Sequence, residues 1–227
     1  MGRDAFAAGL ALALLLAACN PGPAPSASLA HCPTSAPTAD EASAILAGAA
    51  RAVVATSLGS FTIELDPRSA PIATANFVAL ARCGFYGQVS FHRVLAGFVA
   101  QAGDPGTRSD RGDFPGLGAG GPGYQFEVEF PTAEQAYSRY TVAMGNRVQL
   151  DPASGQITGG TDTNGSQFFV DLADLAGRIR PYYSIIGRVV EGTAVVDAIG
   201  QVAVDDPSHG LPLEPVVIES VTVAPGA

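Results

Sequence analysis

Two stretches of the sequence combine an aromatic, strand-like pattern with side chains that can donate hydrogen bonds. FHRVLAGFVAQAGD at 91–104 carries an arginine and a glutamine inside an apolar run, and TNGSQFF at 163–169 carries a glutamine beside two phenylalanines. A guanidinium is strongly disfavoured in an apolar interior unless it has a partner. Arg93 is therefore expected either to pair with a carboxylate in the core or to face a groove. In a groove, its permanent charge and fixed donors could stabilise a developing charge or lone pair on a substrate.

Strand alternation suggests which of these side chains share a face. Residues two apart on a strand point the same way, which pairs Phe91 with Arg93, Val99 with Gln101, and Gln167 with Phe169. If the two stretches lie on neighbouring strands, one face carries an arginine, two glutamines and a phenylalanine, which is typical of a ligand groove. His92 falls on the opposite face, so we interpret it as a buried structural imidazole rather than a general base.

Other kinds of chemistry are disfavoured by composition. All 12 basic residues are arginine, which excludes Schiff-base lysines and the phosphate-loop lysine. The three histidines and three cysteines show no zinc-ligand spacing. The glycine run at 118–123 is followed by a strand pattern, whereas a dinucleotide site needs a helix there. A net charge of −9 and a pI near 4.6 argue against nucleic-acid binding. We expect no metal and no cofactor.

The pattern of elements predicts an all-β, mainly antiparallel fold. Apolar residues make up 47% of the chain, and its 27 glycines and 17 prolines indicate many turns between short strands. Helices are predicted from Pro71 to a Gly84 cap, from a Thr193 N-cap to Gly200, and, as a short piece, within 39–50. Strands are predicted at 52–56, 60–65, 89–95, 97–103, 124–130, 140–145, 166–172, 183–190 and 215–223. Many short strands with two main helices favour a closed or nearly closed sheet, and we expect a monomer.

The N-terminus is typical of an exported protein. Arg3 precedes a short apolar run that ends in LAAC, which resembles the lipobox of bacterial lipoproteins, so Cys19 is predicted to be lipidated. An ordinary cleaved signal is the alternative. The predicted organisation is a signal peptide at 1–18, a Pro/Ala/Ser-rich tether at 19–44 and a folded domain at 45–227.

Two further cysteines, Cys32 and Cys83, are left once Cys19 is set aside. An even number of cysteines in an exported protein favours a disulfide. A bridge would fasten the tether to the folded domain, whereas the alternative is two unpaired thiols.

The two chemical stretches together resemble the cyclophilin family of peptidyl-prolyl isomerases. The family signature F-H-R-[IV]-x-x-x-F-[MV]-x-Q-x-G-D is followed, later in the chain, by N-G-S-Q-F-F, and both occur here in that order. Supporting matches include GGPGY, VAMGN and IIGRVVEG, and the resemblance covers about residues 52–224. It implies a closed eight-stranded antiparallel barrel capped by two helices, with a substrate groove on its outer face.

The resemblance also implies roles for individual residues. Arg93 would be catalytic, and Phe98 and Phe169 would seat the proline ring. Gln101 would orient the arginine and contact the substrate backbone, while the backbone of Asn146 would hold an extended peptide. The residues placed along the groove are Phe98, Val99, Gln101, Gly118, Gly145, Asn146, Gln167, Phe169, Leu175 and Tyr183.

The chain departs from the family pattern at two places along this groove. Gly145-Asn146-Arg147 replaces a common Ala-Asn-Ala, which adds a charge at the rim. The W-L-D-G-x-[HY] segment is altered to DLAGRIRPYYSIIG, with no tryptophan, so Leu175 and Tyr183 rest on an imperfect match.

These features predict a peptidyl-prolyl isomerase that assists the folding of exported proteins. Its partners would be proline-containing polypeptides and, through Cys19, a membrane facing the periplasm or the cell exterior. The alternative is a low-activity chaperone or peptide-docking module that uses the same groove.

Overall fold

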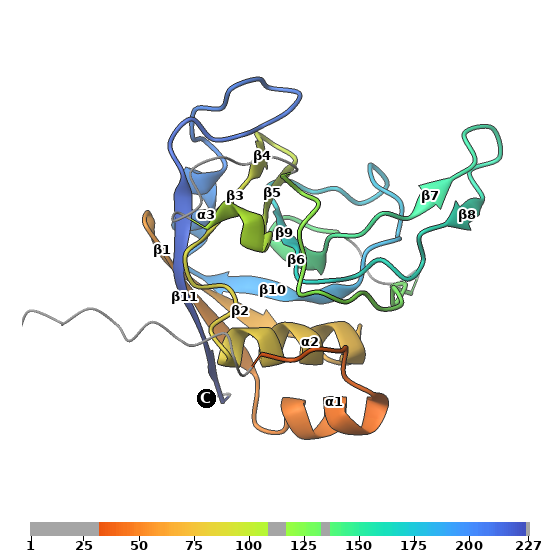
Figure 1. Ribbon diagram of the computed structural model, residues 1–227. Helices are drawn as coiled ribbons and strands as arrows, with labels where there is room; N and C mark the ends of the chain where they lie inside the picture. The colour runs from red at the N-terminus through yellow and green to blue at the C-terminus, as the bar shows by residue number, and fades with distance from the viewer. Residues whose placement is uncertain (1–31, 109–116, 133–136, 226–227) are drawn as a thin grey trace, which may run out of the picture.

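The computed structural model describes residues 32–108, 117–132 and 137–225, and most of its strands belong to one antiparallel sheet (Figure 1). The sheet order is β3-β11-β1-β2-β10-β6-β9-β5-β4, and β7 and β8 form a separate hairpin. The strands are β1 (Arg51–Thr56), β2 (Gly59–Leu65), β3 (Val89–Phe91), β4 (Arg93–Leu95), β5 (Val99–Ala102), β6 (Thr141–Met144), β7 (Gln149–Leu150), β8 (Ile157–Gly159), β9 (Phe168–Asp171), β10 (Ile185–Glu191) and β11 (Val216–Ala224).

The two edges of the large sheet meet at one residue. The order begins with β3 and ends with β4, and only His92 separates these strands along the chain. The His92 backbone N–H donates to the Gln101 carbonyl at 3.0 Å. The sheet thus closes into a barrel through the covalent chain, and counting β3 and β4 as one interrupted strand gives the predicted eight. The predicted fold class is confirmed, and the three α-helices of the described residues lie where the sequence predicts them, the first within 39–50.

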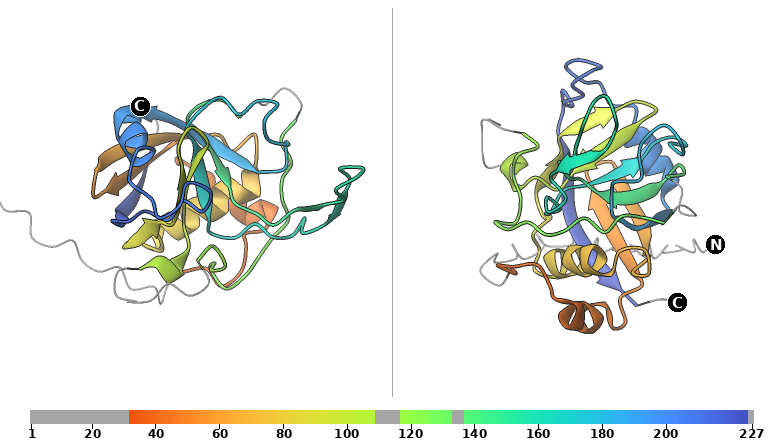
Figure 2. Two further views of the ribbon diagram at one scale, coloured as in Figure 1. Left: turned by 90° about the horizontal axis from the view of Figure 1, so that it is seen from above. Right: turned by 90° about the vertical axis from the view of Figure 1, so that its right-hand side faces the viewer.

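The core fills the barrel and extends to the helix α2 (Pro71–Arg82), which lies between the barrel and the helix α1 (Ala39–Leu46) (Figures 1 and 2). The buried side chains of α2 include Ala73, Phe77, Leu80 and Ala81. Phe77 and Phe168 meet edge to face, with ring centroids 5.5 Å apart. This packing joins α2 to the strand that carries the second chemical stretch.

The residues at which α2 begins and ends agree with the sequence prediction, but its N-terminal cap is a residue far away in the sequence. Pro71 occupies the first turn, and Gly84 beyond the helix has φ +77°, a conformation that favours glycine. The Glu129 carboxylate accepts hydrogen bonds from the backbone N–H groups of Ile72 and Ala73 at 3.0 and 2.8 Å. A carboxylate at this end of a helix satisfies free donors and complements the helix dipole.

The N-terminal segment is part of the folded unit from Cys32 onward. Cys32 and Cys83 form a disulfide with an S–S distance of 2.04 Å, as predicted. Thr38 and Glu41 form a reciprocal capping box at the start of α1, and residues of this segment pack on the core beside α2. Residues 32–44 were predicted to belong to a tether, so the packed region begins earlier than the predicted boundary at residue 45.

Residues 1–31 lie outside the described residues. The predicted signal peptide at 1–18, the lipidation at Cys19 and the first part of the tether therefore stay predictions. Within the described ranges, no helix is long and apolar enough to cross a membrane.

The helix α3 (Thr193–Ile199) begins one residue earlier than predicted. Gly192 is the N-cap, with φ +72°, and Thr193 is the first helical residue. A Cβ at Gly192 would lie 2.3 Å from the carbonyl oxygen of Ser60. Glycine is needed there for both its backbone conformation and its lack of a side chain, so the predicted Thr193 cap is wrong.

The predicted strand at 124–130 is also wrong. Phe126 and Val128 alternate inward as a strand would, but Phe126 makes only an isolated bridge to Asn164. The backbone N–H of Val128 donates to the Thr161 carbonyl, and that of Glu129 donates to the Ser184 hydroxyl. The backbone of this segment is held by acceptors in loops and side chains. The alternation of apolar residues along it therefore indicates which side chains are buried, not that the segment pairs in a sheet.

Candidate functional site

The two chemical stretches lie side by side in the sheet, as predicted. In the β4–β5 ladder Arg93 is opposite Gln101, and in the β5–β9 ladder Gln101 is opposite Phe169. Gln101 therefore stands between the arginine and the aromatic ring. Its Nε2 donates to Gln167 Oε1 at 2.9 Å, which links the two stretches directly.

An apolar pocket with a volume of about 190 Å³ opens beside these residues. Most of its lining side chains are aromatic or aliphatic, and its polar groups include the Arg93 guanidinium and the amides of Gln101 and Asn146. The full lining is Arg93, Phe98, Val99, Gln101, Gly145, Asn146, Phe169, Ile179 and Tyr183. We call this cavity the apolar pocket. Its chemistry suits a small apolar ring held beside a cation and an amide.

Tyr183 forms one wall of the apolar pocket and is held there by Tyr137. The Tyr183 ring meets Phe169 edge to face, with centroids 5.1 Å apart and planes at 89°. The Tyr137 hydroxyl donates to the Tyr183 carbonyl at 2.8 Å and accepts from the Tyr183 backbone N–H at 3.0 Å. Burial raises the pKa of Tyr137 well above its usual value, so the hydroxyl stays a donor. Sequence reasoning missed Tyr137 because it lies far from both motifs.

Leu175 does not line the pocket, contrary to the prediction. It is fully buried in the apolar cluster that supports Phe169 and Tyr183. The backbone turns after Leu175, with the Ile179 N–H donating to its carbonyl at 3.2 Å. This turn brings Ile179 to the wall instead. The spacing of four residues between Leu175 and Ile179 is the sequence signal that could have indicated it.

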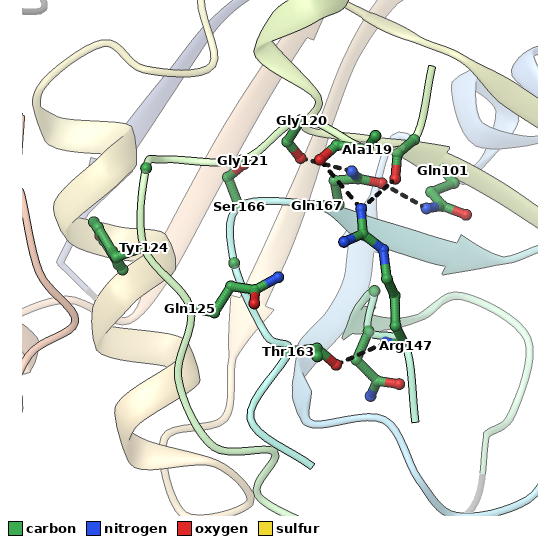
Figure 3. A pocket seen from close by; sticks show the side chains of 15 residues that line it. Gln101, Ala119, Gly120, Gly121, Tyr124, Gln125, Arg147, Thr163, Ser166 and Gln167 are labelled. Atoms are coloured by element: carbon green, nitrogen blue, oxygen red, sulfur yellow. Dashed lines mark hydrogen bonds between the residues drawn. The ribbon is translucent and has the colours of Figure 1, made fainter. Parts of the chain in front are cut away.

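A second, polar pocket of about 410 Å³ lies next to the apolar pocket (Figure 3). The two cavities share Gln101, Gly145 and Asn146. The predicted residues Gly118 and Gln167 line this polar pocket and not the apolar one. Together the two cavities form a groove, in which the polar pocket is walled by a glycine-rich loop at 118–121 and by 163–167.

Asn146 holds the wall between the pockets through its side chain. Its Nδ2 donates to the Tyr182 carbonyl at 2.6 Å, and its Oδ1 accepts from the Val148 backbone N–H at 3.2 Å. Within the described residues, the Asn146 backbone N–H and C=O make no hydrogen bond to the protein. These backbone groups are free for a ligand.

Gln101 is adjacent to Arg93, but no hydrogen bond joins these two described side chains. The amide nitrogen of Gln101 is used by Gln167, whose own Nε2 donates to the Gly120 carbonyl at 2.8 Å. The two glutamines thus fix each other against the glycine-rich loop. Between Arg93 and Gln101 the structure shows only the pairing of their strands. That Gln101 orients the Arg93 side chain stays a prediction.

Asp104 fixes the glycine-rich loop and was not singled out from sequence. Its carboxylate is 1% exposed and accepts hydrogen bonds from Gly106, Gly118 and Gly120 at 2.7, 2.8 and 3.1 Å. A Cβ at Gly120 would lie 2.0 Å from Asp104 Oδ1. The carboxylate replaces solvent for three half-buried backbone donors, two of them in the glycine-rich loop, and so holds this wall of the polar pocket in place.

His92 is buried, as predicted, but the alternation argument fails around it. Because the strand breaks at His92, Phe91 points into the barrel core while Arg93 lines the apolar pocket. Phe91 and Arg93 therefore do not share a face, contrary to the prediction. Burial lowers the pKa of His92 to about 4, so the ring is neutral near pH 7.

Comparison with known proteins agrees with this arrangement of residues. The family described as "Cyclophilin type peptidyl-prolyl cis-trans isomerase/CLD" matches residues 51–223. The chain belongs to the cyclophilin family. Its enzyme class is peptidyl-prolyl cis-trans isomerase, which is also the name of its relatives.

A Helicobacter pylori protein named peptidyl-prolyl cis-trans isomerase is 37% identical over 161 residues, covering 69% of this chain and 83% of that protein. The peptidyl-prolyl cis-trans isomerase-like 3 of Dictyostelium discoideum is 34% identical, covering 74% and 91%. A Cryptosporidium parvum cyclophilin crystallised in the presence of the dipeptide Ala-Pro superposes with a TM-score of 0.63 at 26% identity, covering 78% and 99%.

Proposed function

We propose that this cyclophilin accelerates isomerisation of X–Pro bonds by using Arg93 to stabilise a twisted amide while the proline ring occupies the apolar pocket. The observation that carries this proposal is that Arg93 lines the same pocket as Phe98, Phe169 and further aromatic or aliphatic side chains. The Ala-Pro dipeptide used with the Cryptosporidium relative fits a pocket of this chemistry.

The reaction requires no covalent intermediate and no proton transfer. Rotation about the X–Pro bond crosses a barrier of about 18–20 kcal/mol because amide resonance is lost. In the twisted state the proline nitrogen becomes pyramidal and regains a lone pair. A donor that interacts with this lone pair stabilises the twisted amide more than the planar one, which is differential transition-state binding.

Arg93 meets the requirements of that donor. Arg93 lines the apolar pocket. Within the described residues its guanidinium makes no hydrogen bond or ion pair, so its donors are unpaired. The free backbone groups of Asn146 and the side-chain oxygen Oε1 of Gln101 are placed to hold the substrate backbone. The pocket fixes the ring while the residue before proline rotates.

The proposed setting is the folding of exported proteins at a membrane surface. It is supported by the apolar N-terminal run that ends in LAAC at Cys19 and by the disulfide between Cys32 and Cys83. Disulfides persist in oxidising compartments.

Exchange spectroscopy by NMR on a proline peptide, with the full chain, tests the catalytic assignment. We expect Arg93→Ala to lower kcat/KM by about 10²–10³-fold, the usual effect of removing one transition-state donor. Arg68→Ala is the matched control, because Arg68 is solvent-exposed and outside the groove.

Equal rates for Arg93→Ala and the unmodified protein would refute the role of Arg93. Peptide binding without any acceleration in the unmodified protein would instead identify a docking module.

A further inference from the structure

The groove differs in charge from the rest of the molecule. The chain has 21 acidic and 12 basic residues, for a net charge of −9. The described residues that line the two pockets nevertheless include Arg93 and Arg147 and no aspartate or glutamate. The substrate path is thus lined by two cations on an otherwise acidic protein.

Arg147 extends across the polar pocket. Its backbone N–H donates to Thr163 Oγ1 at 2.8 Å, which fixes the start of the side chain on one wall. Its Nη2 donates to the carbonyl oxygens of Gly118 and Ala119 at 3.2 and 3.1 Å on the opposite wall (Figure 3). The guanidinium therefore lies over the space that a substrate side chain would enter.

The partners of Arg147 leave its charge uncompensated. Both carbonyl acceptors are neutral, and within the described part of the chain Arg147 forms no ion pair. Hydrogen bonds between arginine and a carboxylate are stronger than those to neutral acceptors and can be bidentate. A carboxylate that entered the polar pocket would be a better partner than the two carbonyls.

The residues shared by the two pockets indicate which substrate residue could supply that carboxylate. The pockets share Gln101, Gly145 and Asn146, so an extended peptide seated by its proline continues along the polar pocket. Side chains two residues apart on an extended chain point to the same side and are about 7 Å apart. The residue two positions from the proline would thus face Arg147.

We propose that Arg147 gives this cyclophilin a preference for substrates with aspartate or glutamate two residues from the proline. This inference rests on the proposed isomerase function, because it assumes that proline occupies the apolar pocket. It names a substrate class, acidic proline-containing segments, that the family assignment does not supply.

The test compares kcat/KM for matched peptides Xaa-Ala-Pro-Ala and Ala-Pro-Ala-Xaa, with Xaa as Glu, Gln or Lys, by NMR exchange spectroscopy with the full chain. Exposed charge pairs are weak, so we expect Glu to exceed Gln by about two- to fivefold in one of the two series, with Lys below Gln. High salt should reduce the difference, because it screens exposed charges.

Arg147→Gln should bring the kcat/KM values of the Glu and Lys peptides closer to that of the Gln peptide. Arg147→Lys keeps the positive charge and should keep part of the preference for Glu. Arg68→Gln removes the same charge outside the groove and should leave the preference intact. If Arg147→Gln instead raises kcat/KM equally for all peptides, Arg147 is only a steric barrier and the proposal is wrong. Equal values for Glu and Lys in the unmodified protein also overturn it, whereas no acceleration of any peptide would refute the isomerase function itself.

Discussion

The Asp171 carboxyl under the apolar pocket should make stability fall as pH rises through neutrality. Asp171 has no exposed surface, and neither of its carboxylate oxygens has a hydrogen-bond partner within the described residues. It is opposite Val99 in the β5–β9 ladder, directly behind the pocket wall. Burial, with a smaller contribution from the charge of Asp174, raises its pKa from 3.8 to about 8.

The sign and size of the effect follow from proton linkage. Between pH 3.8 and about pH 8 the folded state holds a proton on Asp171 that the unfolded chain has lost. Stability is therefore greatest below pH 3.8, as far as this group is concerned, and falls by up to about 1.4 kcal/mol per pH unit until about pH 8. From about pH 6.5 to about pH 8 the loss is about 1.7 kcal/mol.

Asp171→Asn tests this prediction by chemical denaturation across that pH range. Asparagine cannot ionise, so we expect the unmodified protein to lose about 1.7 kcal/mol more than the variant as pH rises. The readout is the difference between the two proteins in the slope of the free energy of unfolding against pH. Other titrating groups, including His92, contribute equally to both proteins and cancel in this difference. Asp174→Asn is the control, because it leaves the Asp171 carboxyl in place. The free energy of unfolding should still fall with pH, but the fall should end at a lower pH, because the charge of Asp174 no longer raises the pKa of Asp171. Parallel pH profiles for the unmodified protein and Asp171→Asn would refute the reasoning.

Two more predictions concern the supports of the fold and of the pocket. Replacing Cys32 and Cys83 by serine opens a loop with a sequence separation of 51, and should lower the free energy of unfolding by about 4 kcal/mol. Denaturation of the reduced and oxidised unmodified protein provides the comparison, and equal midpoints would contradict it. Tyr137→Phe removes both hydrogen bonds to the residue 183 backbone, and should lower stability by about 1–3 kcal/mol. It should also raise KM for proline peptides more than it lowers kcat, and an unchanged KM would show that the pocket wall does not depend on this hydroxyl.

Local pattern predicted the short strands, and the family resemblance predicted that the two motifs lie on neighbouring strands. Alternating apolar residues between turn signals indicated short strands, and the family resemblance indicated how they close. The placement of Arg93, Gln101 and Phe169 on neighbouring strands follows from that closure.

The errors occur where long-range contacts override local pattern. His92 interrupts its strand because the sheet closes there, so side-chain alternation does not continue through it. Glu129 alternates as in a strand but serves as the cap of α2. Leu175 was placed on the pocket wall from an imperfect match, and a single turn put Ile179 there instead. Asp104 caps the neighbouring Gly106 locally, but its hydrogen bonds from Gly118 and Gly120 span 14 and 16 residues and could not be read from the local sequence.

The position of the disulfide determines how a pull on the N-terminus would reach the barrel. Tension applied upstream of Cys32 passes through the sulfur–sulfur bond to Cys83, at the end of α2. The chain between the two cysteines, including α1 and β1, lies within the covalent loop and is bypassed. This matters because β1 pairs with both β2 and β11, so peeling it from its start would open the sheet from within. A protein held to a surface through its N-terminus would be attached mechanically at the end of α2, with β1 and β2 outside the loaded path.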